Sequence, residues 1–382
     1  MNKKKQYSIC YIVTIPLTIR SFFIPQLTYL QEKGINVTVI CQYEKNFGKE
    51  LKNINYIPVN IPRGIDFLGM IRALLKLIKI FRKNKYDMIQ YSTPNAAFIS
   101  SLAGCAAGIK IRNYHMMGIR YLGFHGAVKN IFKIIEKVTC MFSTSVECVS
   151  KTNLKLCIKE RLFKPEKGTV VWNGSTGGVD LNKFDYSKRK LWRNEIRNKL
   201  GYSEKDFVYG FVGRITKDKG INELLTAFLA LKDDSKLLIV GSVEKDNHLD
   251  ARLLKKAYEY PNIIFHDFVS DIERYYAAMD VLILPSYREG FGNVVIEAGA
   301  VGTPAIVTDI PGPMDTIVKM KTALSIPAKN ILKLEQAMKK IRILDYKQMG
   351  QFAAEFSSNH FDCEKLNQKV FERKSRLLGL VE

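Results

Sequence analysis

The fold of this chain is decided by the stretch Pro285-Ser286-Tyr287-Arg288-Glu289-Gly290-Phe291-Gly292-Asn293-Val294-Val295-Ile296-Glu297. Residues 280–284 before it predict a buried strand, and residues 294–301 after its turn predict a helix packed on a sheet. Glu289 is therefore expected in the loop at the carboxyl end of a strand, and Glu297 one turn into the next helix. In an open α/β sheet, ligands bind at that end of the strands.

The turn within this stretch has the composition of an anion-binding loop. Gly290 and Gly292 let the backbone approach a ligand closely, and a helix start near Asn293 offers backbone N–H groups to an anion. Two glutamates at this spacing are also common on solvated helix faces. The functional interpretation therefore depends on what accompanies them.

A second segment of the chain, residues 211–220, has matching chemistry. It follows a predicted strand at 207–212 and leads into a helical pattern that begins at Ile221. Arg214 and Lys219 lie five residues apart in it, and the pair suits a diphosphate because Arg offers a planar fork and Lys a point charge. Further strands are expected at 237–242, ending in a glycine loop, and at 262–265.

The ordered set of these elements resembles the family 4 retaining glycosyltransferases of the GT-B fold. The two glutamates match that family's Glu-x7-Glu signature, and Arg214 and Lys219 match its Gly-Arg…Lys-Gly element. The resemblance implies an α/β protein whose two Rossmann-like domains, each with a parallel sheet, face one another across a cleft. It divides the chain into an acceptor-side domain at 1–172, a nucleotide-sugar-binding domain at 173–360 and a helix at 361–382 that crosses back to the first domain.

The resemblance also implies an activity and its residues. A sugar would pass from a nucleoside diphosphate, UDP being favoured, to a hydroxyl of a glycan or lipid-linked acceptor in capsule, exopolysaccharide or O-antigen synthesis, with retention at the anomeric carbon. Glu289 and His115 would act at the donor sugar, and Glu297 at the ribose. The donor-binding set would be Gly213, Arg214, Lys219, Gly241, Val269, Gly290, Phe291, Gly292, Asn293 and Glu297. No D-x-D triplet occurs, so transfer without a metal or other cofactor is expected.

In the amino-terminal half, predicted strands alternate with predicted helices. The strands are expected at 7–14, 36–41, 55–59 and 88–91, and the helices at 22–32, 67–83 and 96–107. This alternation predicts a parallel sheet covered by helices. A loop at 14–20 replaces the glycine pair of many relatives, and its Arg20 is a candidate for a phosphate or an ordinary surface arginine. Arg120 is a second acceptor-side candidate, and His115 has a structural reading beside its functional one.

The positive charge is concentrated in the first half of the chain. Residues 1–170 hold 27 Lys and Arg against 9 Asp and Glu, or +18, whereas the other 212 residues hold 32 against 28, or +4. Helical patterns at 67–83 and 129–137 carry basic faces, which either are simply solvated or contact an anionic surface. A membrane leaflet is favoured over nucleic acid, for which no recognition motif is visible. We therefore expect a cytoplasmic protein peripheral to the inner face of the membrane.

Length and composition agree with this interpretation. A chain of 382 residues predicts two domains, and the seven cysteines and five histidines show no zinc-binding spacing. Residues 1–5 imitate the start of a signal peptide, but the apolar run that follows is short and Pro16 interrupts it, so a first strand is expected. Two alternatives stay open: a non-hydrolysing UDP-sugar epimerase, and a non-catalytic nucleotide-sugar-binding subunit recruited to membranes.

Overall fold

A computed structural model of the chain describes residues 6–244 and 248–380. The chain folds as two compact units: unit 1 is Met1–Gly177 with Cys363–Glu382, and unit 2 is Gly178–Asp362. The chain thus leaves unit 1 after residue 177 and returns to it at residue 363. The basic start at residues 1–5 and the end of the predicted last helix at 381–382 lie outside the described residues.

Unit 1 is built on a parallel sheet whose strand order, within the described residues, is β3-β2-β1-β4-β5-β6-β7. The strands are β1 (Ser8–Ile12), β2 (Asn36–Cys41), β3 (Asn55–Pro58), β4 (Met88–Tyr91), β5 (Ile111–Met116), β6 (Ser145–Cys148) and β7 (Gly168–Thr169). The helices are α1 (Pro16–Phe22), α2 (Ile24–Glu32), α3 (Phe47–Glu50), α4 (Phe67–Asn84), α5 (Pro94–Ala106), η1 (Arg120–Gly123), α6 (Gly126–Phe142), α7 (Lys151–Lys159), η2 (Pro165–Lys167) and α15 (Cys363–Leu377).

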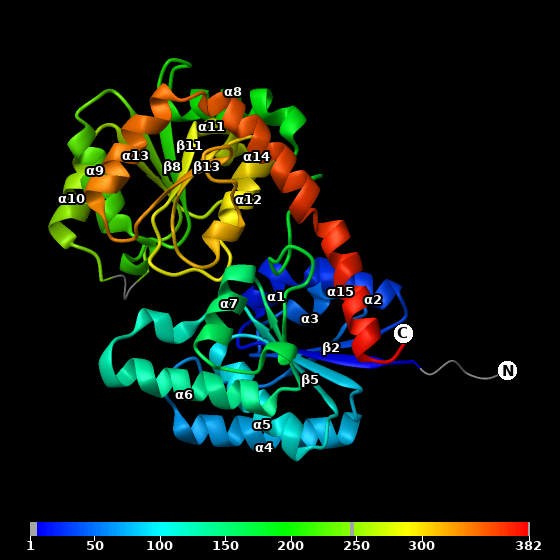
Figure 1. The fold of residues 1–382 in the computed structure, drawn as a ribbon. Helices are drawn as coiled ribbons and strands as arrows, with labels where there is room; N and C mark the ends of the chain where they lie inside the picture. The colour runs from blue at the N-terminus through cyan, green and yellow to red at the C-terminus, as the bar shows by residue number, and fades with distance from the viewer. Residues whose placement is uncertain (1–5, 245–247, 381–382) are drawn as a thin grey trace. The chain divides into compact units, whose positions relative to one another are not determined.

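Alternate residues of these strands enter two separate hydrophobic cores, because successive side chains of a strand point to opposite faces. Cys10 and Ile12 of β1 pack with α4, α5 and α6, whereas Ile9 and Tyr11 pack with α1, α2 and the end of the chain near Leu378. Figure 1 shows α4, α5 and α6 on one side of this sheet, with α2 and α15 on the other. The helix that ends the chain is therefore part of the amino-terminal domain's packing.

One segment of unit 1 differs from the sequence prediction. Residues 14–20 were expected to form a loop, yet α1 begins at Pro16 and runs to Phe22. Proline is well suited to the first position of a helix, since the N–H that it lacks would have no partner there and its φ is already helical. The helix then breaks at Phe23 before α2 begins, so the predicted helix at 22–32 corresponds to α2.

Unit 2 has the same architecture, with the order β10-β9-β8-β11-β12-β13 in a parallel sheet of its described residues. The strands are β8 (Val208–Val212), β9 (Lys236–Val240), β10 (Ile263–His266), β11 (Val281–Leu284), β12 (Ala305–Thr308) and β13 (Ala323–Ile326). The helices are η3 (Tyr186–Lys188), α8 (Arg189–Leu200), η4 (Lys217–Lys219), α9 (Ile221–Leu231), α10 (Ala251–Glu259), α11 (Ile272–Ala278), α12 (Asn293–Ala300), η5 (Pro313–Asp315), α13 (Ile331–Ile343) and α14 (Tyr346–Phe361).

Candidate functional site

The sheet of unit 2 has its topological switch point between β8 and β11. From β8 the chain proceeds outward through β9 and β10, and it then returns to β11 and proceeds the other way to β12 and β13. Ligands of such sheets bind beside the carboxyl ends of the two strands at the switch point. Most of the predicted donor-binding residues follow these two strands, and the rest follow the neighbouring strands β9 and β10: Gly213, Arg214 and Lys219 follow β8, Gly241 follows β9, Val269 follows β10, and Glu289, Gly290, Phe291, Gly292, Asn293 and Glu297 follow β11.

The structure brings Lys219 and Glu289 into direct contact, although they are seventy residues apart in the chain. Lys219 Nζ lies 2.5 Å from Glu289 Oε1, and the Ser286 hydroxyl donates to the same oxygen at 2.8 Å. Their side chains are 17% and 13% exposed, so the pair is mostly shielded from water but still reachable. The contact joins the loop after β8 to the loop after β11. Ser286 is a member of this cluster that the sequence did not single out.

Other contacts hold the same two loops together. The backbone N–H of Tyr287 donates to the Asp218 carbonyl at 2.9 Å, and Arg288 pairs with the Asp218 carboxylate at 3.1 Å. Burial alone would raise the pKa of Asp218, but its Thr216 hydrogen bond and Arg288 lower it overall. Gly220 is required here, because a Cβ atom at its position would lie 2.1 Å from the Pro285 carbonyl oxygen. Lys219 is therefore presented by a tightly held loop.

The turn into α12 has the backbone conformation that the glycines predicted. Gly292 precedes the helix with φ of 99°, in the left-handed region that favours glycine, and as a glycine it has no side chain with which to cap the helix. The ring of Phe291 is buried and packs against Phe361, with ring centroids 5.4 Å apart. We therefore infer that the ring stabilises the turn. Phe291 belongs to the predicted donor-binding set because of its position in the turn, and not because of an exposed side chain.

Glu297 lies on α12, half-buried beside a tyrosine. The Tyr276 hydroxyl donates to Glu297 Oε2 at 2.9 Å. Burial raises the pKa of Glu297, and the tyrosine hydrogen bond and Lys183 only partly oppose this. Glu289 is instead paired directly with a cation. The two carboxylates thus have different surroundings, which allows them different roles.

The loops after β8, β9 and β10 complete the rim of the site. Gly213 and Gly241 have φ of 146° and 149°, and a Cβ atom at Gly241 would lie 1.9 Å from the Gly213 carbonyl oxygen. Arg214 is more exposed than Lys219, with 54% of its side chain accessible, and it pairs with Glu244 at 3.1 Å. Val269 is half-buried, but its neighbour Phe268 is 80% exposed. Phe268 was not predicted from the sequence, because an aromatic residue next to a strand is normally part of the hydrophobic core.

In unit 1, the structure places His115 inside β5 and buries it to 3% exposure. Its Nδ1 lies 3.0 Å from Glu147 Oε1, and its Nε2 lies 3.2 Å from the Thr176 hydroxyl. Both ring nitrogens are thus engaged within unit 1. Glu147 and Thr176 were not identified from the sequence, because a strand glutamate and a linker threonine carry no distinctive local pattern.

The two predicted acceptor-side arginines have protein partners. Arg20, on α1, makes hydrogen bonds of 2.5 Å to both Glu44 and Glu50, and these contacts raise its pKa. Arg120 donates to Asn95 Oδ1 at 3.2 Å, with its guanidinium 4.5 Å from the centre of the Phe132 ring. Arg20 is therefore better placed to hold α1 against the α3 region than to extend toward a phosphate.

Residues 6–244 and 248–380 lack two features that bear on the predicted class. No helix there is long and apolar enough to cross a membrane. No three His, Cys, Asp or Glu side chains in the same residues are arranged to hold a metal ion. Transfer without a metal stays a prediction, because only a measurement of the reaction tests it.

Comparison with known proteins identifies the family. A model described as Glycosyltransferase Family 4 matches residues 26–176, and one described as Glycosyl transferases group 1 matches residues 193–355. CapM, a capsular polysaccharide biosynthesis glycosyltransferase of Staphylococcus aureus, is 32% identical over 343 residues, which is 88% of each protein. The chain belongs to glycosyltransferase family 4.

This glycosyltransferase has further relatives in sequence and structure. A UDP-Gal:alpha-D-GlcNAc-diphosphoundecaprenol alpha-1,3-galactosyltransferase of Escherichia coli is 29% identical over 259 residues, 65% of each chain. A glycosyltransferase from Rickettsia africae matches 98% of this chain and 99% of its own, with a TM-score of 0.81 and 21% identity. Anabaena HepE in complex with UDP matches 97% of this chain and 100% of its own, with a TM-score of 0.78 and 18% identity. These likenesses confirm the GT-B fold of two Rossmann-like domains.

Proposed function

We propose that this glycosyltransferase takes a sugar from a nucleoside diphosphate, UDP in the first instance, bound at the switch point of unit 2. The observation that carries the proposal is the contact between Lys219 and Glu289, which joins the loops after β8 and β11 where a ligand of this fold binds. The UDP complex of Anabaena HepE and the UDP-galactose named for the Escherichia coli relative support the choice of nucleotide. The acceptor would be a hydroxyl of a lipid-linked glycan, as the diphosphoundecaprenol in the name of the Escherichia coli relative suggests. The pathway would be capsule or other surface polysaccharide synthesis, as the name of CapM suggests.

The proposed chemistry follows from where charge develops. Breaking the anomeric bond leaves negative charge on the departing diphosphate, and Lys219, Arg214 and the N–H groups at the start of α12 would stabilise it without a metal. A lysine ammonium has three N–H donors, so Lys219 would reach a phosphate oxygen while it still holds Glu289. The departing phosphate oxygen would accept the proton of the acceptor hydroxyl, and the sugar would transfer with retention.

The two glutamates would divide the work. Glu289, oriented by Lys219 and Ser286, would contact the donor sugar, whereas Glu297, beside Tyr276, would accept hydrogen bonds from the ribose hydroxyls. Glu289→Gln should therefore lower kcat with little change in UDP affinity. Glu297→Gln should chiefly weaken UDP binding. Equal and small effects in both variants would contradict this division of roles.

Mass spectrometry of products is the direct test of the function. The enzyme is incubated with a panel of UDP-sugars, with and without undecaprenyl-diphosphate-linked acceptors, and transfer should appear as an acceptor heavier by one sugar residue. Anomeric configuration in the product, read by NMR, tests retention. An altered UDP-sugar or free sugar formed from the donor alone would instead indicate an epimerase, and nucleotide binding without any product would indicate a binding subunit.

We further propose that unit 1 contacts an anionic membrane through α4 and α6, placing the enzyme on the inner face of the membrane. The helix α4 carries five Lys and Arg and no acidic residue, and large apolar side chains stand exposed among them, such as Leu68, Ile71 and Leu75. On α6, Val128, Ile131 and Ile134 are similarly exposed beside Lys129, Lys133 and Lys137. Cations and apolar groups on one surface are the usual composition of a membrane-binding helix.

The position of these side chains supports the same proposal. Both helices pack against α5 on one face of the sheet, so their exposed surfaces belong to the same side of unit 1 (Figure 1). The apolar residues lie mainly in the first halves of the two helices, and each helix begins after the carboxyl end of a strand, β3 or β5. The lipid-facing surface would thus adjoin the edge of the sheet at which ligands bind.

A further inference from the structure

Unit 1 has an open hollow of about 560 Å³ that takes no part in the site described above. Three elements contribute its lining: Gln42 and Tyr43 follow β2, Pro58 and Asn60 lie at the end of β3, and Lys76 belongs to α4. The hollow therefore opens where two neighbouring parallel strands end. Because ligands of such sheets bind at the carboxyl edge, this position favours a binding site over an incidental gap.

The two amide side chains of the hollow are paired with one another. Gln42 Nε2 donates to Asn60 Oδ1 at 3.0 Å. The backbone of Gln42 is held as well, since its N–H donates to the Thr14 carbonyl and its own carbonyl accepts from the Tyr56 hydroxyl. Among residues 6–244 and 248–380, Gln42 Oε1 and Asn60 Nδ2 have no hydrogen-bond partner. A fixed pair of amides thus keeps one acceptor and one donor group for a ligand.

The aromatic wall of the hollow is Tyr43, whose side chain is 74% exposed. A single exposed aromatic residue is ordinary, but this one stands beside the paired amides. A tyrosine ring offers a rigid, flat, largely apolar surface at a low cost in conformational entropy. Lys76 Nζ donates to the Pro58 carbonyl at 3.0 Å and has two further N–H donors. A pyranose sugar, which has a face of C–H groups and a rim of hydroxyls, matches both kinds of surface.

The place of the hollow in the sheet limits which part of a glycan it can hold. The sheet of unit 1 has its switch point between β1 and β4, because the chain proceeds outward from β1 through β2 and β3 and then returns to β4. The hollow lies beside β2 and β3, two strand spacings outward from that point, which is roughly 10 Å. This is the span of about two sugar residues in a glycan chain.

We propose that the hollow is a carbohydrate subsite that holds a sugar of the acceptor other than the one that receives the transferred sugar. Tyr43 stacks on the C–H face of this sugar, and Gln42 and Asn60 bind its hydroxyls. The inference rests on the proposed function, since only an enzyme that extends a glycan needs to hold a sugar that does not react. Lys76 also belongs to α4, the helix for which lipid contact is proposed, so the sugar would lie in the part of the acceptor near its lipid.

The experiment is saturation-transfer-difference NMR on the full chain, with the methyl glycosides of glucose, galactose, mannose and N-acetylglucosamine as probes. In the native enzyme, we expect transfer to the C–H protons of at least one probe. The signal should fall in Tyr43→Ala and persist in Tyr43→Phe, which keeps the ring. Asn60→Asp should weaken it, because a carboxylate oxygen replaces the amide donor. Tyr258→Ala is the matched control, since Tyr258 is an exposed tyrosine of α10 in unit 2.

Absence of transfer to all four probes in the native enzyme, or unchanged transfer in Tyr43→Ala, would overturn the proposal. The UDP affinity of each variant, measured by calorimetry, checks that it is folded. In transfer assays, Tyr43→Ala should raise the KM for the lipid-linked acceptor about tenfold, with kcat and the KM for the UDP-sugar unchanged. An unchanged acceptor KM would contradict the subsite. Because the NMR measurement needs neither donor nor lipid-linked acceptor, sugar binding that depends on Tyr43 would stand even if the transferase assignment failed.

Discussion

The two units share a doubly wound parallel fold but place their paired charges differently. In unit 2, Lys219 and Glu289 stand in loops at the edge of the sheet and stay partly exposed, whereas in unit 1 Lys374 and Glu147 lie inside the packing between a sheet and a helix. A loop pair that water and ligand both reach is suited to binding. A pair shut away from solvent is suited to fixing structure. We therefore expect the same two residue types to serve different purposes in the two halves of the enzyme, according to how deeply each pair is buried.

Breaking the buried pair should give the largest effect on stability. Removing Lys374 takes away one of the positive groups that stabilise the buried Glu147 carboxylate, and breaking a buried ion pair costs about 3–5 kcal/mol in proteins. We therefore expect Lys374→Met to lower the free energy of unfolding by that amount in urea titrations. Glu289→Gln, which breaks the pair of unit 2 whose side chains are 17% and 13% exposed, should lower it by less, because water still reaches the lysine that is left. Similar losses in both variants would mean that burial does not separate the two pairs.

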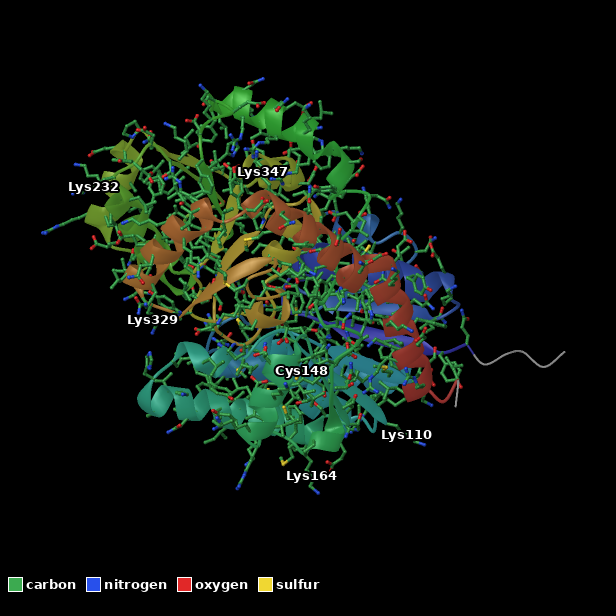
Figure 2. The ribbon with its side chains drawn as sticks, turned by 45° about the horizontal axis from the view of Figure 1, so that its top comes forward. Lys110, Cys148, Lys164, Lys232, Lys329 and Lys347 are labelled. Atoms are coloured by element: carbon green, nitrogen blue, oxygen red, sulfur yellow. The ribbon has the colours of Figure 1, made fainter. Side chains whose placement is uncertain are left out.

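The second-largest difference between the two units is expected in how strongly their outer surfaces bind lipid. Changing Lys76, Lys79, Arg82 and Lys83 of α4 to Gln should weaken binding to anionic vesicles by roughly 1 kcal/mol for each cation that lies near the lipid. The matched control removes four exposed cations of unit 2: Lys232, Lys255, Lys256 and Lys347, two of which are labelled in Figure 2. Sedimentation with vesicles at rising salt measures both. Equal losses in the two variants, or equal binding to neutral vesicles, would contradict a surface specific to α4.

This contrast also explains what the sequence could predict. The residues around Arg214, Lys219 and Glu289 lie in short loops between a strand and a helix, so local pattern alone placed them at the sheet's carboxyl edge. The cluster around His115 depends on Lys374, which bonds to a glutamine 284 residues away and looks, in sequence, like one more charge on an amphipathic helix. No local pattern records such a partner. The helix α1 was missed for a different reason, since Pro16 reads as a breaker unless its place at a helix start is known.

Within unit 2, the degree of burial should also rank the two diphosphate-binding candidates. Lys219→Ala removes a shielded cation and should weaken UDP binding, measured by calorimetry, by about 1.5–3 kcal/mol. Lys217→Ala is the matched control, because Lys217 is exposed on the same short helix η4. An unchanged UDP affinity in Lys219→Ala would contradict diphosphate binding by Lys219, and the Lys219–Glu289 contact would then be purely structural.

Changing Arg214 should have the smallest effect on UDP binding. The sign of the effect at its partner Glu244 is informative. The Arg214 side chain is 54% exposed and paired with Glu244, and exposed ion pairs are worth about 0–1 kcal/mol because water and salt screen them. Arg214→Ala should thus weaken UDP binding by less than Lys219→Ala does. Glu244→Gln should strengthen it slightly, since the arginine would no longer be shared with a competing carboxylate and the local negative charge would fall. Calorimetry at low and high salt measures both changes, and they should shrink together as salt rises. If Glu244→Gln weakened binding instead, Glu244 would be orienting Arg214 toward the diphosphate, and the exposed pair would have to be regarded as part of the site.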